Sequence, residues 1–336
     1  MTVPPSVVVA LEGALGGAVQ RSAPLGARTT YRVGGPAAVL VEAGSADDLA
    51  AVARALVVPA STSPVPLVVV GRGSNLLVAD AGFDGVAVVL GEGMASISLD
   101  DTVVTAGGAA SLPVVARRSA AAGLTGFEWA VGVPGSIGGA VRMNAGGHGS
   151  EMVAVLGGVR VVDLRTGEDG WMSAASLELG YRRSSLLPHQ VVAAAELRLG
   201  PGDRTTAEAE LSEIVRWRRE HQPGGANAGS VFTNPPGDSA GRLLDAAGAK
   251  GLRVGTAEVS TKHANFIQAD DEGSADDVVA LMAAMRALVR EHAGVDLHAE
   301  THLLGFDQAR AEAAGARLLE GLEGSDGAHP RREIEG

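Results

Sequence analysis

The sequence predicts an α+β fold divided into two or three compact units, and three observations lead to this prediction. Its 336 residues exceed what a single hydrophobic core usually serves. Strand-like and helical patterns alternate along the chain, and hydrophobic residues make up 46% of it although aromatic ones supply only 3%. Two glycine-rich loops interrupt these patterns, each directly after a strand-like stretch.

The first expected unit is a strand–helix–strand arrangement that ends at the first glycine-rich loop. Residues 37–43 and 65–70 have the continuous apolar character of buried strands. Between them Ser45, followed three residues later by Asp48, forms a capping-box-like helix start. The helix that follows places leucine and valine side chains on one face.

Short strands continue beyond this unit, interrupted by a helix that opens at Ser111 and Pro113 and stops at Gly123. The later strands among them are expected to build a second sheet. The run from Gly200 to Asp203 is rich in turn formers and marks a domain junction. These strands are predicted over residues 86–90, 102–106, 159–164, 170–172 and 191–199.

The remainder of the chain is predicted to be mainly helical before it ends in a tail. Helices are expected over residues 207–221 and 238–247, and a third begins at Ser274 with Asp277 in its first turn. A final strand is predicted over residues 297–304, then a helical stretch up to residue 322 and a disordered tail over 324–336.

Composition and charge exclude several classes of function. The formal net charge of −12 argues against a nucleic-acid partner, and no apolar run reaches membrane-spanning length without a break. The N-terminus lacks the basic segment of a signal peptide, so we expect a cytoplasmic protein. The chain has no cysteine, and its eight histidines are scattered without ligand spacing, so we expect no metal site.

The two glycine-rich loops carry the first functional signal. They are residues 71–75, GRGSN, and residues 132–140, GVPGSIGGA, and neither is followed by a helical pattern. Because glycine lacks a Cβ and tolerates positive φ, such loops let backbone N–H groups approach a diphosphate closely. The first loop lacks the third glycine and the downstream acidic residue of a Rossmann fingerprint. Together the loops predict an extended dinucleotide, a flavin, wedged between two subdomains.

Seven segments, in the same order, resemble the UDP-N-acetylenolpyruvoylglucosamine reductase family, whose FAD domain is of the vanillyl-alcohol-oxidase type. The resemblance covers the chain from about residue 25 to residue 306. The segments are residues 30–37 (TYRVGGPA), 71–78 (GRGSNLLV), 133–146 (VPGSIGGAVRMNAG), 180–185 (GYRRSS), 227–232 (NAGSVF), 262–267 (KHANFI) and 297–300 (LHAE).

The resemblance implies a two-subdomain FAD-binding fold followed by a separate α+β substrate-binding domain. It implies non-covalent FAD, NADPH as the hydride donor, and reduction of the enolpyruvyl ether of UDP-N-acetylglucosamine enolpyruvate to UDP-N-acetylmuramate. We expect a monomer that binds these small molecules and neither nucleic acid nor membrane. The expected parts are an N-terminal segment (1–24), two FAD-binding subdomains (25–93 and 94–202), the substrate-binding domain (203–306) and a variable, partly disordered tail (307–336).

The family's motifs also imply roles for particular residues. Arg182 would bind the substrate carboxylate, Glu300 would assist while protonated, and Ser230 would protonate the carbanion. Without the resemblance, the simpler interpretation is that Arg182 is an exposed arginine, Glu300 a glutamate on an edge strand and Ser230 a serine in a turn. Expected FAD contacts are Gly34, Gly35, Gly71, Arg72, Gly73, Ser74, Asn75, Leu76, Pro134, Gly135, Ser136, Gly138, Gly139, Asn144 and Ala145. Expected substrate contacts are Tyr181, Asn234, Lys262, His263 and Asn265.

The chain departs from the family pattern in two places. His221 stands where the family usually carries a lysine that contacts the substrate diphosphate, so another cation must replace it; candidates are Arg219, Lys250 and Lys262. The run 186–190 is short and has no aromatic residue, as in the branch of the family that lacks a tyrosine lid loop.

Two other functions stay open at the level of sequence. A flavin oxidase of the same FAD-domain group would act on a sugar or alcohol, and many such oxidases tether the flavin through histidine or cysteine. His148 is the nearby candidate for such a tether. A flavin-binding module without catalysis would keep the loops, although the joint presence of Arg182, Ser230 and Glu300 argues against it.

Overall fold

The first sheet contains the apolar runs of the N-terminal part of the chain. In the computed structural model, which describes residues 3–57 and 64–319, its strands lie in the order β1-β2-β5-β3. β1 is antiparallel to β2, whereas β2, β5 and β3 run parallel. The bounds are β1 Val19–Ala23, β2 Ala37–Ala43, β3 Leu67–Val70 and β5 Phe83–Leu90.

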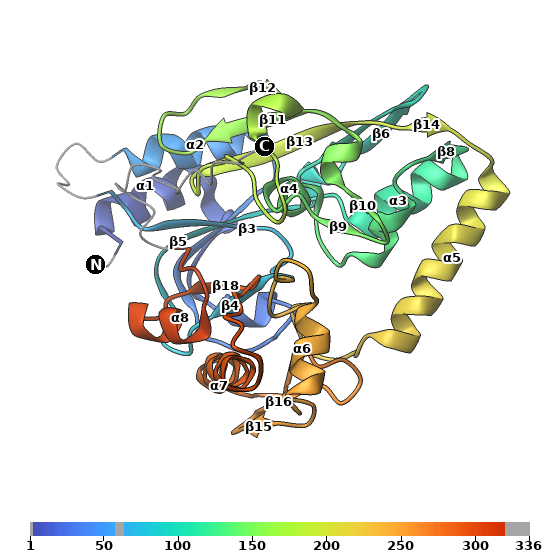
Figure 1. Ribbon diagram of the computed structural model, residues 1–336. Coiled ribbons are helices and arrows are strands. Elements are labelled where there is room, and N and C mark those ends of the chain that lie inside the picture. Colours follow the sequence, from blue (N-terminus) through green and yellow to red (C-terminus); the bar gives the residue numbers. More distant parts are fainter. Residues whose placement is uncertain (1–2, 58–63, 320–336) are drawn as a thin grey trace, which may run out of the picture.

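Both faces of this sheet are buried, as expected for parallel strands with continuous apolar runs. Helices α1 (Pro5–Leu15) and α2 (Ala46–Leu56) pack on one face, and they lie together at one side of the molecule in Figure 1. The other face packs against strand β4 (Leu76–Val78). The predicted cap of α2 is confirmed, since the Ser45 hydroxyl accepts a hydrogen bond from the Asp48 amide at 3.1 Å.

The second sheet is antiparallel throughout, with strand order β12-β11-β13-β7-β6. It confirms the strands predicted over 102–106, 159–164, 170–172 and 191–199, whereas β6 was not predicted and the strand over 86–90 lies in the first sheet as β5. Its bounds are β6 Ile97–Asp100, β7 Val103–Gly107, β11 Leu156–Asp163, β12 Asp169–Ser173 and β13 Gln190–Arg198. Short ladders accompany it, formed by β8 (Leu124–Thr125) with β14 (Gly200–Pro201) and by β9 (Gly146–Gly147) with β10 (Ser150–Glu151).

Helices α3 (Leu112–Ala121), α4 (Ile137–Arg142) and α5 (Arg204–His221) share the hydrophobic core of the second sheet. One expectation was wrong here: the second glycine-rich loop leads directly into α4. The pattern IGGAVR carries two glycines, which hide a helical start from propensity, but Ser136 caps it by accepting a bond from the Gly139 amide at 3.4 Å.

The third unit is built around one long helix, α7 (Ala275–Ala293), whose apolar face meets a small antiparallel sheet. Figure 1 shows α6, α7 and α8 grouped away from the two larger sheets. The remaining bounds are α6 Ala240–Ala246, β15 Arg253–Val254, β16 Ala257–Val259, β17 Ile267–Ala269, β18 His302–Leu304 and α8 Gln308–Ala314. Within the described ranges, no helix has both the length and the apolar character needed to cross a membrane.

A strand pair and a helix cap are among the contacts that join the third unit to the first. Strand β18 runs parallel to β4 in a two-stranded ladder, with His302 opposite Leu76. Asp80, two residues after β4, receives hydrogen bonds from the Ser274 hydroxyl at 2.6 Å and the Ala275 amide at 2.9 Å. These contacts fix the third unit against the first glycine-rich loop.

Three further elements differ from the predicted ones. The N-terminal segment forms α1 and β1, which alternation alone did not reveal because α1 is apolar almost all round. The predicted strand over 297–304 is limited to β18, since residues 297–301 take an irregular path. A helix after residue 306 is confirmed as α8, while the expected tail over 324–336 lies outside the described residues.

Candidate active site

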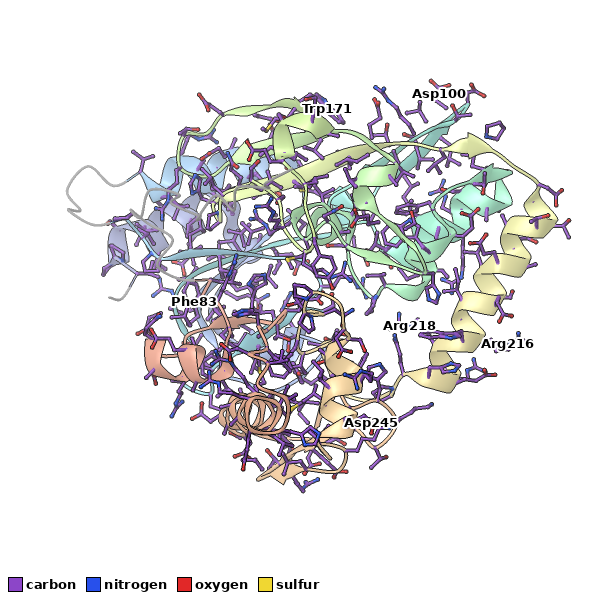
Figure 2. All side chains as sticks on the ribbon, viewed as in Figure 1. Phe83, Asp100, Trp171, Arg216, Arg218 and Asp245 are labelled. Atoms are coloured by element: carbon purple, nitrogen blue, oxygen red, sulfur yellow. The ribbon has the colours of Figure 1, made fainter. Side chains whose placement is uncertain are left out.

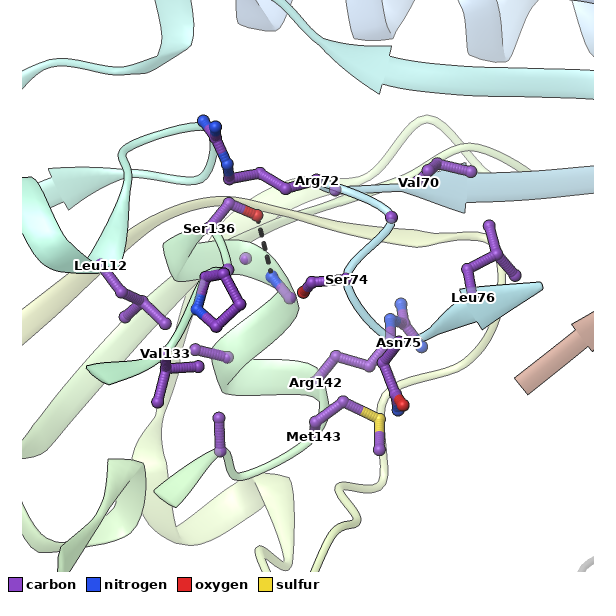
Figure 3. A pocket seen from close by; sticks show the side chains of 18 of the residues that line it. Val70, Arg72, Ser74, Asn75, Leu76, Leu112, Val133, Ser136, Arg142 and Met143 are labelled. Atoms are coloured by element: carbon purple, nitrogen blue, oxygen red, sulfur yellow. Dashed lines mark hydrogen bonds between the residues drawn. The ribbon is translucent and has the colours of Figure 1, made fainter. Parts of the chain in front are cut away.

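A cleft of about 1500 Å³ is lined by residues of both sheets and of the third unit. Both glycine-rich loops line it, together with residues from all three units. Figure 3 shows Arg72, Ser74 and Asn75 on the loop that follows Val70, with Ser136 opposite them. The two loops, which are about 60 residues apart in the sequence, therefore form facing walls of one cavity.

The first loop exposes unused backbone donors. No backbone N–H from Arg72 to Asn75 donates a hydrogen bond within the described ranges. Gly73 has φ +61°, and a Cβ there would lie 2.7 Å from Thr29 Cα, so only glycine fits. A Cβ at Gly71 would lie 2.7 Å from the Ser136 hydroxyl oxygen, because the two loops approach so closely.

The second loop is tied down more firmly by the sheet behind it. Its Ile137 and Gly138 amides donate to the Ala110 and Gly108 carbonyls, each at 2.9 Å. The loop therefore contributes its rigid shape and the Ser136 hydroxyl rather than a row of free amides. A diphosphate needs close backbone approach and several donors, so the pair of loops fits the diphosphate of a dinucleotide.

The charge of the cleft is opposite to the charge of the chain. Seven arginines and three glutamates are among the described residues that line it, in a protein with a formal net charge of −12. A cleft with an excess of cations between apolar walls concentrates anionic ligands. The charge pattern therefore indicates that this cleft binds an anionic ligand.

All three predicted catalytic residues line this cleft. Arg182 and Glu300 form an ion pair, with Arg182 Nε 2.8 Å from Glu300 Oε1. The N–H bond of Nε does not point at that oxygen, so the pair has electrostatic contact without a well-formed hydrogen bond. Arg182 also adopts φ +55°, a strained conformation for arginine of the kind found at functional sites.

Glu300 is held from both sides by its backbone. Its amide donates to the Val231 carbonyl at 2.8 Å, and the Asn75 side chain donates to its carbonyl at 3.0 Å. Burial raises the pKa of its carboxyl group, and the nearby Arg182 opposes this shift only in part. A raised pKa is what a carboxyl group that assists while protonated requires. Asn75 links the backbone of Glu300 to the first glycine-rich loop.

Ser230 presents an unengaged hydroxyl to the cleft. The hydroxyl has no hydrogen-bond partner in the part of the chain that the structure describes. Asn265 fixes the residues that follow, because its side chain accepts from the Phe232 amide at 3.0 Å and donates to the Phe232 carbonyl at 2.8 Å. The hydroxyl therefore stands on a rigid segment and is free to contact a ligand.

Most of the predicted FAD contacts line the cleft. They are residues 71–76, Pro134, Gly135, Ser136, Gly138, Gly139 and Ala145. Gly34, Gly35 and Asn144 lie outside the lining. A Cβ at Gly34 or Gly35 would meet the carbonyl oxygens of Val78 or Asp80 within 2.4 Å, which gives these glycines a packing role. Asn144 is fully buried and holds the Gly180 carbonyl at 3.2 Å.

The five predicted substrate contacts also lie outside the cleft lining. Tyr181 is 55% exposed beneath the Arg182 guanidinium, and Asn234 accepts from the Ala240 amide at the start of α6. Lys262 donates to the Arg219 carbonyl, while His263 packs edge-on against Phe266 at 4.9 Å. Asn265 is engaged by Phe232. The assignment of these five side chains to the substrate therefore stays a prediction.

The cation near the expected diphosphate contact is Arg218. His221 is exposed, stacks on Trp217 at 4.6 Å and does not line the cleft; neither do Arg219, Lys250 or Lys262. Arg218 lines it, and burial lowers the pKa of its guanidinium. Figure 2 shows Arg218 on the inner side of α5 and Arg216 on the outer side. Arg218 follows Leu211 and Ile214 at helical spacing, and this periodicity could have indicated from the sequence that Arg218 lies on the buried side of α5.

Two family models match the chain and together cover most of the region described above. The FAD binding domain matches residues 37–169, which include both glycine-rich loops. The C-terminal domain of UDP-N-acetylenolpyruvoylglucosamine reductase matches residues 221–304, which include Ser230 and Glu300.

Individual proteins are similar over nearly the whole chain. The UDP-N-acetylenolpyruvoylglucosamine reductase of Heliobacterium modesticaldum is 40% identical over 87% of this chain and 92% of its own length. That of Anaeromyxobacter dehalogenans is 43% identical over 91% of this chain and 89% of its own. The crystal structure of UDP-N-acetylenolpyruvylglucosamine reductase from Thermus caldophilus superposes with a TM-score of 0.73 at 35% identity, covering 85% of this chain and 98% of that one.

Proposed function

The chain belongs to the UDP-N-acetylenolpyruvoylglucosamine reductase family, and from this premise we propose how its cleft performs the family's reaction. The activity is the NADPH-dependent, FAD-mediated reduction of UDP-N-acetylglucosamine enolpyruvate to UDP-N-acetylmuramate, a step of peptidoglycan precursor synthesis. The observation that carries the proposal is the meeting of Arg182, Ser230 and Glu300 in the cleft that both glycine-rich loops line.

The first glycine-rich loop and Ser136 would hold the diphosphate of FAD. The four amides from Arg72 to Asn75, which donate no hydrogen bond within the described ranges, would be its backbone donors, and the Arg72 side chain would add positive charge. When bound, FAD accepts a hydride from NADPH and delivers it to the enolpyruvyl double bond. The Asn75 side chain donates to the Glu300 backbone carbonyl, so the loop that would hold the cofactor also positions the backbone of Glu300.

Arg182, Glu300 and Ser230 act on the substrate. Hydride addition to the enolpyruvyl group leaves negative charge beside its carboxylate, and Arg182 stabilises that charge. Burial raises the pKa of Glu300 and so favours its protonated form, which would donate a hydrogen bond to the same carboxylate. The free Ser230 hydroxyl transfers its proton to the carbanion carbon.

The decisive experiment follows the flavin spectrum without oxygen. The protein is reduced with one equivalent of NADPH, and UDP-N-acetylglucosamine enolpyruvate is then added. We expect the absorbance of oxidised flavin to return in proportion to the substrate added. If the flavin stays reduced until air is admitted, the alternative of an oxidase acting on a sugar or alcohol is favoured instead.

We also propose that the enzyme is a cytoplasmic monomer with non-covalent FAD and no nucleic-acid partner. The formal net charge of −12 supports the absence of a nucleic-acid partner. Light scattering coupled to gel filtration tests the monomer, with a mass near 33.8 kDa expected. Denaturation followed by filtration should remove the yellow colour from the protein, whereas colour that stays with the polypeptide contradicts non-covalent binding.

A further inference from the structure

Arg142 is a cation at the cleft wall that the reaction described above does not use. Its guanidinium donates hydrogen bonds to the carbonyl oxygens of Leu186 at 3.3 Å, Leu187 at 3.0 Å and Gln190 at 2.5 Å. Burial lowers its pKa to about 10, which leaves it charged at neutral pH. Within the described ranges no carboxylate lies within ion-pair distance of it. Three carbonyl dipoles offset this charge only in part.

His302, whose pKa the charge of Arg142 lowers, adds no negative charge to this region. His302 lines the same cleft, and its Nε2 lies 3.3 Å from Met143 Sδ. The pKa of His302 is lowered to about 4, mainly by burial and to a smaller extent by the charges of Arg142 and Arg317. Its ring is therefore neutral at physiological pH. The surroundings of Arg142 therefore have a positive electrostatic potential.

This positive region borders the reacting groups. Ser184, two residues after Arg182, donates its hydroxyl to the Arg142 carbonyl at 2.7 Å. His302 follows Glu300 by two residues, and its amide donates to the Asn75 carbonyl at 3.1 Å. Figure 3 shows the Arg142 side chain reaching toward Asn75 from the end of α4. Arg142 is thus hydrogen-bonded to the segment that carries Arg182, and its charge acts on His302, which lies two residues after Glu300.

We propose that Arg142 sets the reduction potential of the bound FAD by stabilising the negative charge that reduction creates. A hydride from NADPH brings two electrons and one proton, so the isoalloxazine ring gains one negative charge. A fixed cation in a poorly solvated site lowers the free energy of that charged state more than that of the neutral oxidised ring. The inference rests on FAD binding in this cleft.

The charge of Arg142 would have a different effect if it bound the FAD diphosphate instead of acting on the isoalloxazine ring. The diphosphate carries the same charge in both redox states, so a cation that binds it strengthens both states equally and leaves the reduction potential unchanged. A cation that acts on the ring strengthens the reduced state selectively. The ratio of the dissociation constants of oxidised and reduced FAD therefore distinguishes the two roles.

The test uses Arg142→Gln, which removes the charge but keeps amide donors for the 186–190 carbonyls. We expect the preference for reduced over oxidised FAD to fall about tenfold, which corresponds to a potential lower by about 30 mV for a two-electron couple. Arg142→Lys, which retains the charge, should keep most of the preference. The reduction potential, and from it the preference for reduced over oxidised FAD, is measured by dye-equilibrated titration without substrate. The result therefore does not depend on whether the enolpyruvyl substrate is accepted.

The matched control is Arg286→Gln. Arg286 also donates to backbone carbonyls, those of Leu297 and Glu312, but it lies in the third unit outside the cleft lining. Its replacement should leave the potential at the wild-type value. Should Arg142→Gln fail to fold, Arg317→Gln removes the second charge near His302 and should lower the potential by a smaller amount. An unchanged potential, or equal weakening of both redox forms, overturns the proposal.

Discussion

The paired charges at the reacting centre show how single residues are set up for their roles. Arg182 and Glu300 face each other at 2.8 Å, yet burial keeps the pKa of Glu300 raised. Arg182 holds a strained backbone conformation because Asn144 and Gly180 fix the turn before it. A substrate carboxylate entering between these groups would take over the arginine charge and leave the glutamic acid as a donor.

Replacing Ser230 with alanine separates the two half-reactions. Because the hydroxyl has no partner within the described ranges, its loss disturbs little else. We expect Ser230→Ala to reduce its flavin with NADPH at the wild-type rate and to reoxidise it with the enolpyruvyl substrate at least about a hundredfold more slowly. Stopped-flow absorbance measures both rates, and equal slowing of the two would contradict the role of proton donor.

The pH dependence of the reoxidation rate reports on Glu300. Its protonated fraction falls as pH rises through its raised pKa, so we expect reoxidation to slow on the alkaline side. Glu300→Gln cannot titrate and still donates a hydrogen bond, so it should flatten that limb and retain more activity than Glu300→Ala. An alkaline limb that survives in Glu300→Gln would assign it to another group, and equal losses in both variants would exclude the hydrogen-bonding role.

The short segment that carries Ser230 depends on one buried amide. Asn265, 3% exposed, satisfies both the amide and the carbonyl of Phe232. Asn265→Ala leaves two buried backbone groups unpaired, so we expect the free energy of unfolding to fall by about 2–4 kcal/mol. Urea denaturation measures this. A variant of wild-type stability with a raised KM would instead support the direct substrate contact predicted from sequence.

The cap of helix α7 joins two structural units. Asp80 of the first unit accepts from Ser274, Ala275 and Asp276 at the start of α7. Asp80→Ala removes this cap and should lower stability by about 1–2 kcal/mol. It should also raise the KM for the substrate, since the third unit is then held less firmly. Ser45→Ala, which uncaps α2 in the first unit, serves as the control and should leave KM unchanged.

At the scale of the whole molecule, three structural units surround a cationic cleft. The core of the second sheet includes Leu211 and Ile214 of α5, so this helix packs with that sheet although it follows the predicted junction. Tyr31 and Leu77 of the first unit join the core of the third. The units are therefore coupled through side chains from neighbouring segments, and the cleft between them is left for the cofactor.

Removal of FAD should destabilise this arrangement. A ligand that binds only the folded protein adds stability by mass action, about 2.7 kcal/mol when its concentration is a hundred times its Kd. We expect the apoprotein to melt at a lower temperature than the holoenzyme and added FAD to restore the value. Differential scanning fluorimetry measures this, and identical melting with and without FAD would contradict binding between the units.

The sequence by itself determined the elements whose pattern is local. Neighbouring residues alone specify the apolar run of β2, the Ser45 cap of α2 and the periodicity of α7. The glycine-rich loops likewise indicate, from their composition, places where other atoms approach the backbone closely. Family motifs pointed to Arg182, Ser230 and Glu300, which the fold brings to one cleft. Alternation did not predict α4 or the irregular path before β18, because glycine content and long-range pairing override propensity there.

Only the tertiary structure decided which side chains of each motif face the cleft. Asn144 and Asn265 lie in matching segments, yet they are buried and bond to backbone groups. Arg142 and Arg218 were not among the site residues predicted from the sequence, yet both line the cleft. The physical reason is that a hydrogen-bonding or charged side chain takes its role from the partners that long-range packing brings to it, and adjacent sequence does not specify those partners.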